Sequence, residues 1–207
     1  MSGCWIPEPD TGYSARLVLI RAPKKLANFP EILLVLAKEK IIKNTNDSEG
    51  YFRKPAGWEM PGGSFEKEKG DTSLVDTVIR ETKEEAGVRV QKKDLAPGCS
   101  VVDKSLSLRP QYRFASTETF LAVKPATFEP YTQPETVDEV ENIAFFGLNR
   151  LPEGDLGLRP SSLLRLSRVF KGGVARNLMY LAGISDQVMD ESVHILEKQL
   201  QQTSDIS

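Results

Sequence analysis

Apolar residues along this chain occur either in short uninterrupted runs or at helical spacing. Residues 15–22 (ARLVLIRA) and 31–39 (EILLVLAKE) are β-branched apolar runs separated by a loop that contains Pro and Lys. Such runs are typical of buried strands, and these two are predicted to be core strands that can pair as a hairpin. Residues 99–106 and 112–125 predict two further strands, and residues 143–148 (IAFFGL) predict a short buried strand.

Helical spacing and turn-forming residues divide the rest of the chain. Residues 161–172 and about 185–202 carry apolar positions at helical intervals, so both are predicted to be helices. Residues 43–57 form a polar, turn-rich stretch, and residues 125–142 form a loop rich in Pro and acidic residues. Because no internal repeat or low-complexity linker interrupts the chain, residues 1–207 are predicted to form a single α/β domain with a helical C-terminal end.

The composition narrows the class of protein. The chain has 207 residues, of which 40% are hydrophobic and 27% are charged, and its formal net charge is −2. These values are typical of a globular protein and give no reason to expect general nucleic-acid binding. No apolar run reaches the roughly 18 residues that a membrane span requires. The N-terminus lacks the charged and apolar regions of a signal peptide, so a cytoplasmic location is expected.

The scarcity of cysteine and histidine excludes several kinds of chemistry. Cys4 and Cys99 are too few for a disulfide framework or a cysteine zinc site. The single histidine, His194, lies in an amphipathic helical pattern, where a packing or surface role is the ordinary one. A Ser-His-Asp triad and a multi-histidine metal site are therefore not supported. Carboxylates remain for metal binding and for acid–base chemistry.

A third helix is predicted over residues 73–86, and it ends in a run of acidic side chains. Ser73 and Asp76 fit a capping box, and Gly87 suits the position that follows the last helical turn. At about 100° per residue, the apolar side chains fall on one arc and three glutamates fall on the arc beside it. The apolar arc comprises Leu74, Val75, Val78, Ile79 and Ala86, and the acidic arc comprises Glu81, Glu84 and Glu85.

This arrangement favours a cation site. Glu81, Glu84 and Glu85 border a buried stripe, so they are partly desolvated, and their spacing makes them repel one another. Hard oxygen ligands on one helical face suit Mg²⁺ or Mn²⁺, which commonly bridge to substrate phosphates. The alternative interpretation is a solvated charge run in which Arg80 and Lys83 are the partners of the glutamates.

The sequence before this helix favours the cation site over the charge run. WEMPGG (58–63) places a Pro and two glycines where the backbone can turn tightly and approach a ligand. With RETKEEAG (80–87), it resembles the box of the Nudix hydrolase family, which runs Gly, five residues, Glu, seven residues, then Arg-Glu-apolar-x-Glu-Glu-x-Gly-apolar. The matching positions are Gly63, Arg80, Glu81, Glu84, Glu85, Gly87 and Val88. The resemblance covers residues 15–152 and leaves about 153–207 as a helical extension.

The box also departs from the family pattern. Sixteen residues separate Gly63 from Arg80, three more than in the family, and the insertion falls in EKEKGD (66–71). The residue eight positions before Arg80 is Thr72, so the first box glutamate is absent. Thr82 stands where the family has an apolar residue. The acidic candidates for the place of the absent glutamate are Asp71, Glu68 and Glu66.

The resemblance implies a fold, a reaction and roles for the box residues. The expected fold is an α+β sandwich in which a mixed β-sheet lies between helices. The expected activity is Mg²⁺-dependent hydrolysis of a diphosphate linkage in a nucleoside diphosphate derivative, such as ADP-ribose, a nucleotide sugar or a dinucleotide, with Mn²⁺ as a second possible ion. By resemblance, Glu81 and Glu85 are the main metal ligands, Glu84 and the carbonyl of Gly63 complete the set, and Arg80 orients the glutamates.

The resemblance leaves alternatives for the general base and the substrate contacts. In some relatives the base matches Glu81, and in others it comes from a loop before the last core strand. The acidic residues of that loop are Glu135, Asp138, Glu139 and Glu141, of which Glu139 is favoured. Aromatic candidates for stacking on a base are Trp58, Phe65 and Tyr112, and cationic candidates for phosphate contacts are Arg109 and Arg113, although aromatic residues near strands more often belong to the core.

Other functions fit parts of the pattern. The absent box glutamate suggests a catalytically weak, nucleotide-binding sensor module of the same fold. An isoprenoid diphosphate isomerase is disfavoured, since by resemblance its chemistry needs a cysteine ahead of the box and more histidine. A purely structural protein would leave the glutamate cluster unexplained. The expected partner is a small nucleotide and not a membrane, and the C-terminal helices either cover the core or form a homodimer contact.

Overall fold

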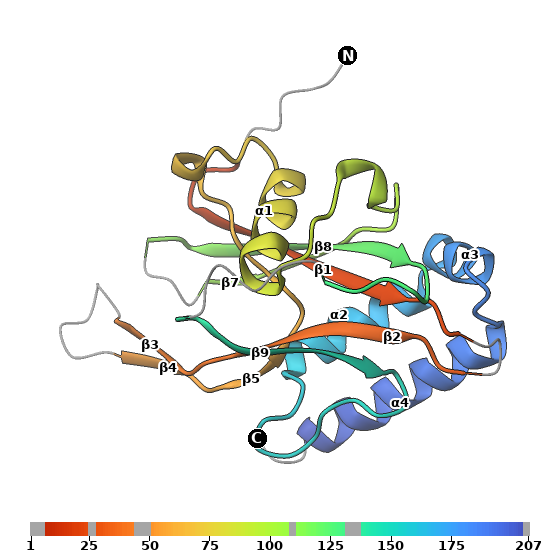
Figure 1. Cartoon of the computed structure of the whole chain (residues 1–207). Coiled ribbons are helices and arrows are strands. Elements are labelled where there is room, and N and C mark those ends of the chain that lie inside the picture. The colour runs from red at the N-terminus through yellow and green to blue at the C-terminus, as the bar shows by residue number, and fades with distance from the viewer. Residues whose placement is uncertain (1–6, 25–27, 44–50, 108–110, 131–137, 205–207) are drawn as a thin grey trace.

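A mixed β-sheet lies at the centre of the structure, between helix α1 on one face and helices α2, α3 and α4 on the other (Figure 1). The structure is a computed structural model, and it describes residues 7–24, 28–43, 51–107, 111–130 and 138–204. This arrangement confirms the α+β sandwich expected from the family resemblance.

The sheet is built around its two longest strands. Strand β1 (Thr11–Arg21) pairs in parallel with β8 (Phe114–Lys124) along its whole length. It pairs with β2 (Glu31–Ala37) only at Ile20↔Ile32 and Arg21↔Glu31, so the predicted hairpin forms at the strand ends nearest the loop. The path through the sheet is β5–β2–β1–β8–β7, with β6 paired to β1 and β9 paired to β2. The remaining strands are β5 (Gly57–Glu59), β6 (Gly62–Ser64), β7 (Val101–Leu106) and β9 (Val140–Gly147).

Both faces of the sheet are covered, which explains why β1 and β2 are continuous apolar runs. Along β1, Leu17 and Leu19 face the cluster beneath α1, whereas Val18 and Ile20 face the cluster beneath the C-terminal helices. All four side chains are fully buried. Each face therefore has its own hydrophobic core, and the two cores share the central strands.

The helices largely follow the predictions. They are α1 (Leu74–Ala86), α2 (Pro160–Lys171), α3 (Gly173–Leu181) and α4 (Asp186–Ser204), with short 3₁₀ turns at Lys67–Lys69 and Lys92–Asp94. Helix α3 was not expected from the spacing. The C-terminal helices cover the core, since Leu166, Phe170 and Met189 are fully buried against the sheet cluster.

Two local expectations were wrong. The polar stretch at 43–57 is not simply a loop, because β3 (Lys40–Lys43) and β4 (Tyr51–Lys54) pair in an antiparallel two-stranded sheet. The strand predicted as buried is β9, which is mostly half-buried: its only fully covered residue is Val140, and Glu141 and Asn142 are exposed. Among the described strands, β9 pairs only with β2, so its outer edge has no neighbour to cover it.

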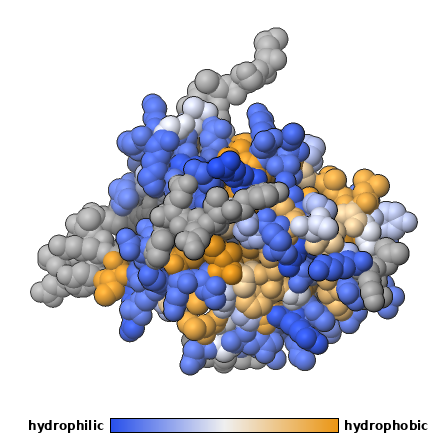
Figure 2. All heavy atoms as spheres, viewed as in Figure 1, coloured by the Kyte–Doolittle hydropathy of each residue, from blue (hydrophilic) through white to orange (hydrophobic). Residues whose placement is uncertain are grey.

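The surface is mainly hydrophilic, with separate hydrophobic patches (Figure 2). One patch lies on the side where α3 is found in Figure 1, and α3 carries the exposed apolar residues Val174 and Leu181. No helix in the described part of the chain is both long and apolar enough to cross a membrane.

Candidate active site

The Pro-Gly-Gly turn brings backbone close to a carboxylate of α1. Gly62 has φ 143°, and a Cβ at this position would lie 2.1 Å from the carbonyl oxygen of Ala15 on the paired strand β1. A Cβ on Gly63 would lie 2.3 Å from Cδ of Glu81. Gly62 therefore requires glycine, whereas a side chain at Gly63 would displace the carboxylate of Glu81, which lies directly against the backbone.

Helix α1 begins and ends as its sequence predicts. The Ser73 hydroxyl accepts the N–H of Asp76 at 3.2 Å, which satisfies one of the free donors at the helix start. The Asp76 carboxylate in turn accepts the N–H of Thr72 at 3.1 Å and the Ser73 hydroxyl at 3.0 Å. Gly87 adopts φ 62° and donates to the Lys83 carbonyl, which closes the last turn. These caps fix where the helix begins and ends, and therefore which of its residues face the glycine turn.

Arg80 is the centre of the acidic cluster. Its Nη1 donates to Glu81 at 2.9 Å and to Glu84 at 3.1 Å. Its other nitrogens bind both carboxylate oxygens of Asp71, at 3.0 and 2.8 Å, and Nη2 also donates to the carbonyl of Ser64 at 3.1 Å. The guanidinium thus joins the helix, the glycine turn and the segment before the helix. The Asp71 contact raises the pKa of Arg80, so it stays charged.

Two of the three glutamates are buried in spite of their charge. Glu81 is 8% exposed and Glu85 is 9% exposed. Glu85 accepts the backbone N–H of Gly62 at 2.8 Å. Burial raises the pKa of Glu85 to about 7, although Arg16 and that N–H act in the opposite direction. Burial also raises the pKa of Glu81, against the pull of Arg80. A carboxylate in this position has a high affinity for protons or for cations.

A second charged group lies before the turn, and no motif or spacing along the chain predicted it. Glu59 of β5 is 6% exposed and faces Arg159 at 2.7 Å, Lys54 at 3.2 Å and Arg16 at 3.8 Å. Burial opposes ionisation of Glu59, but the charges of these three cations lower its pKa to about 2. Arg16 also donates to the carbonyls of Met60 and Gly62, so this group holds the turn in place from the face opposite α1.

Comparison of the chain with models of protein families identifies the family to which it belongs. The NUDIX domain model matches residues 17–166, which include the glycine turn, α1 and the sheet. The chain belongs to the Nudix family. It is accordingly classed as a Nudix-type pyrophosphohydrolase.

Comparison with solved structures finds one of similar fold, and two further matches are weaker. RenU, a Nudix hydrolase from M. smegmatis, has a TM-score of 0.52 and 15% identity, over 86% of this chain and 91% of that protein. An Ap4A hydrolase from C. elegans has a TM-score of 0.48 and 20% identity, over 84% and 99%. A MutT/nudix family protein from Enterococcus faecalis has a TM-score of 0.47 and 22% identity, and the match spans 69% of this chain but only 45% of that protein. A comparison with curated protein sequences gives no significant match.

Among the acidic candidates for the place of the absent box glutamate, Asp71 is the one that binds Arg80. It is 4% exposed, and besides binding Arg80 in two places it accepts the Thr77 hydroxyl at 2.9 Å and the N–H of Glu66 at 3.0 Å. Of the other two candidates, Glu66 pairs with Lys69 at 3.3 Å and Glu68 is exposed. The inserted 3₁₀ turn, Lys67–Lys69, is followed by Gly70 at φ 89°, which directs the chain back so that Asp71 meets Arg80.

The donor set of the Nudix box fits a hard divalent cation. Glu81, Glu84, Glu85 and the Gly63 carbonyl offer oxygen atoms only, as Mg²⁺ prefers, and the lack of a Cβ at Gly63 leaves the backbone open beside Glu81. In the described residues, no three acidic, Cys or His side chains already converge as a metal site. Glu81 and Glu84 are instead held by Arg80, so a cation would compete with the guanidinium for these oxygens.

The raised pKa of Glu85 predicts how stability depends on pH without metal. Its pKa rises from the ordinary 4.5 to about 7 in the folded state, so the folded protein binds this proton more tightly than the unfolded chain. The resulting stabilisation is complete below about pH 4.5 and is lost as pH rises through 7, with a maximum of roughly 3 kcal/mol. We expect Glu85→Gln to gain stability relative to wild type between pH 5 and pH 8 in denaturant titrations with EDTA. Parallel pH dependences of the two proteins would contradict this.

The structure does not bring all predicted site residues together. Trp58 is 8% exposed and packs edge-on against Phe146 in the core beneath the C-terminal helices, at 4.7 Å between ring centres. Arg113 is exposed and lies over the ring of Phe114. Glu139 is half-exposed and pairs with Lys40 at 2.6 Å. Arg109 and Glu135 lie outside the described residues.

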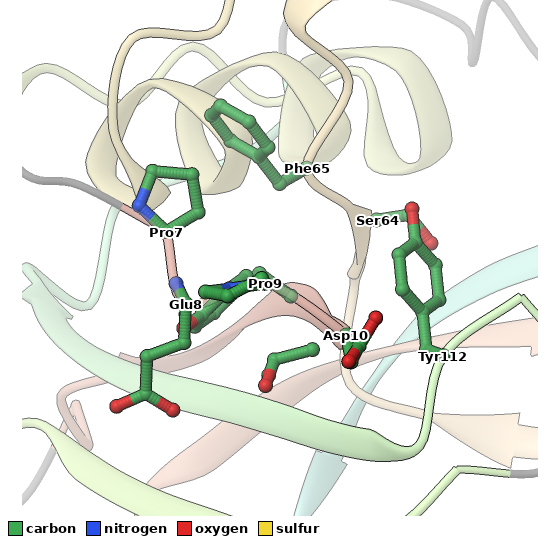
Figure 3. A pocket seen from close by; sticks show the side chains of 9 residues that line it. Pro7, Glu8, Pro9, Asp10, Ser64, Phe65 and Tyr112 are labelled. Atoms are coloured by element: carbon green, nitrogen blue, oxygen red, sulfur yellow. Dashed lines mark hydrogen bonds between the residues drawn. The ribbon is translucent and has the colours of Figure 1, made fainter.

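The remaining two candidates meet at one cavity. Phe65 follows β6 and Tyr112 precedes β8, and both line a cavity of about 310 Å³ together with residues from the start of β1 (Figure 3). The cavity adjoins the Nudix box, because Ser64, which also lines it, gives its carbonyl to Arg80.

Proposed function

We propose that this Nudix protein hydrolyses, with Mg²⁺, a diphosphate linkage in a nucleoside diphosphate derivative such as ADP-ribose, a nucleotide sugar or a dinucleotide. The observation that carries the proposal is the burial of Glu81 and Glu85 against a turn that only glycine can form. Buried carboxylates of this kind destabilise the protein unless a cation offsets them, and a binding function accounts for their presence.

The metal would be held by the carboxylates of Glu81, Glu85 and Glu84 and by the carbonyl of Gly63. When bound, Mg²⁺ neutralises phosphate charge and lowers the pKa of a bound water. Mn²⁺ can take the same ligands. Arg80 positions Glu81 and Glu84, and Asp71 fixes Arg80. The backbone N–H of Gly62 orients the carboxylate of Glu85.

Glu81 is the general base that the geometry favours over Glu139. The carboxylate of Glu81 lies at the glycine turn, where the other proposed ligands gather. Glu139 forms its ion pair with Lys40 at the start of β3, and its backbone carbonyl accepts the N–H of Lys38. A base must come within hydrogen-bond reach of the attacking water, which the place of Glu81 allows.

The alternative function is a catalytically weak nucleotide sensor of the same fold. The sensor function was suggested by the absent box glutamate. The carboxylate of Asp71, next to that position in the chain, binds Arg80. Hydrolysis is therefore the better supported function. A cytoplasmic location and a homodimer, both expected from the sequence, stay predictions.

The test is a screen for phosphate-containing products with Mg²⁺ in excess over each compound. ADP-ribose, NADH, nucleotide sugars, dinucleoside polyphosphates and nucleoside triphosphates are incubated with the protein, with EDTA in parallel. We expect nucleoside monophosphate from at least one diphosphate-linked compound, and no product with EDTA. Thermal stabilisation by ADP-ribose with no product from any compound would instead support the sensor.

A further inference from the structure

The cavity beside the glycine turn has no assigned role in the hydrolysis described above. Its volume is about 310 Å³, at the low end of ligand pockets, so it fits one nucleoside and not two. Three parts of the chain form it: the segment before and within β1, the end of β6, and the residue that precedes β8 (Figure 3). Its lining comprises Pro7, Glu8, Pro9, Asp10, Thr11, Tyr13, Ser64, Phe65 and Tyr112.

Aromatic rings form two sides of the opening. In Figure 3, Phe65 lies on the side of α1 and Tyr112 lies on another side of the cavity. Tyr112 is held against Gly12, where a Cβ would lie only 2.7 Å from Cδ2 of the ring. The backbone N–H of Phe65 donates to the carbonyl of Tyr13 at 2.9 Å, and its side chain is partly buried against the cluster beneath α1. Rings fixed in this way are suited to stacking on a planar base.

The polar lining distinguishes a nucleoside from a phosphate. Two acidic residues, Glu8 and Asp10, and two hydroxyl-bearing residues, Thr11 and Ser64, line the cavity, and none of the described lining residues is a cation. Carboxylates accept from amino and hydroxyl groups and repel phosphate. Because Glu8 also pairs with Lys104 at 3.5 Å, Asp10 is the stronger candidate to accept from a base.

The cavity lies within a nucleotide's length of the Nudix box. Phe65 is two residues beyond Gly63, which corresponds to roughly 7 Å along an extended chain. Between them, the carbonyl of Ser64 accepts from Arg80, whose guanidinium holds Glu81 and Glu84. A ligand with its base in the cavity can therefore place its phosphates at the carboxylates of α1.

We propose that this cavity binds the nucleoside part of the substrate, with a purine that carries an exocyclic amino group stacked on Phe65 and Tyr112. The amino group donates to the carboxylate of Asp10. The inference rests on the proposed function for the position of the diphosphate, but the binding of the base depends only on the cavity.

The first test measures the binding of AMP by calorimetry in the full chain with Mg²⁺, which offsets the repulsion between the phosphate and the carboxylates of α1. We expect Tyr112→Ala to raise the Kd for AMP about tenfold, within the range for loss of a stacked base. Tyr180→Ala is the matched control, because Tyr180 is 64% exposed on α3 and lies outside the cavity. No binding of AMP, or equal effects of the two substitutions, would overturn the proposal.

The second test removes the charge of Asp10 while keeping the shape of its side chain. Asp10 has φ 63°, a conformation that Asn adopts readily, so Asp10→Asn should preserve the fold. IMP differs from AMP in carrying a carbonyl in place of the amino group. We expect wild type to bind AMP at least about fivefold more tightly than IMP, and Asp10→Asn to remove most of that preference. Equal affinity of wild type for AMP and IMP would disprove the role of Asp10.

The outcomes separate this inference from the proposed function. If no compound is hydrolysed but AMP binding depends on Tyr112, the hydrolase proposal fails and the base site stands. If hydrolysis is found and Tyr112→Ala leaves both KM and AMP affinity unchanged, the base site fails and the hydrolase proposal stands.

Discussion

Replacement of Glu81 or Glu85 by glutamine is expected to reduce turnover at least about 100-fold, as occurs when a metal-site or acid–base group is lost. Glutamine keeps the size of the side chain and can still accept the N–H of Gly62 at position 85, but it has no charge to bind a divalent cation. We therefore expect both variants to fold and to lose activity. Steady-state kinetics on whichever compound the Mg²⁺ screen identifies measures this effect.

The matched control for these variants is Glu191→Gln on α4. Glu191 is an exposed carboxylate of a helix that lies on the other side of the sheet, so its turnover should equal that of wild type. Circular dichroism and unfolding curves show whether each variant is folded. Turnover near that of wild type in either Glu81→Gln or Glu85→Gln would reject the assignment of these two residues.

Asp71→Ala is expected to lower both stability and activity. Without Asp71, the guanidinium of Arg80 loses two hydrogen bonds in a site where its side chain is 14% exposed. Breaking a buried ion pair costs about 3–5 kcal/mol, and because Arg80 keeps Glu81 and Glu84 we expect about 2–3 kcal/mol. Since Arg80 positions two proposed metal ligands, the Mg²⁺ concentration for half-maximal activity should rise about 10-fold or more.

Glu68→Ala is the control for Asp71. Glu68 lies in the same inserted segment and is exposed, so its removal should change neither stability nor Mg²⁺ dependence. Denaturant titration and Mg²⁺ titration of activity give the two readouts. If Glu68→Ala shows the larger loss, or if Asp71→Ala behaves as wild type, Asp71 does not take the place of the box glutamate.

The features that the sequence predicted correctly depend on residues close together along the chain. The cap residues Ser73 and Gly87, the helix between them and the position of its glutamates follow from short-range rules, because capping bonds and helical spacing involve residues only a few positions apart. The same holds for the apolar runs of β1 and β2, whose burial on both faces is visible in their composition. The two glycines of the turn were also recognisable, although the reason for Gly63 is a contact with a distant residue.

Contacts between distant residues could not be found in this way. The group around Glu59 draws Arg16, Lys54 and Arg159 from three different parts of the chain, and no spacing rule connects them. Helix α3 and strand β3 were not predicted, and strand β4 was assigned to a loop, because these short segments carry weak periodic patterns.

By itself, the sequence determined that three carboxylates line one side of a capped helix behind a glycine turn, because each of those features depends on neighbours along the chain. Only the tertiary structure decided that Asp71, at the end of the inserted segment, binds Arg80. It also decided that Trp58 belongs to the core and that Phe65 and Tyr112 line the same cavity. These outcomes depend on which strands pair and how far the chain folds back, and composition and spacing do not specify either.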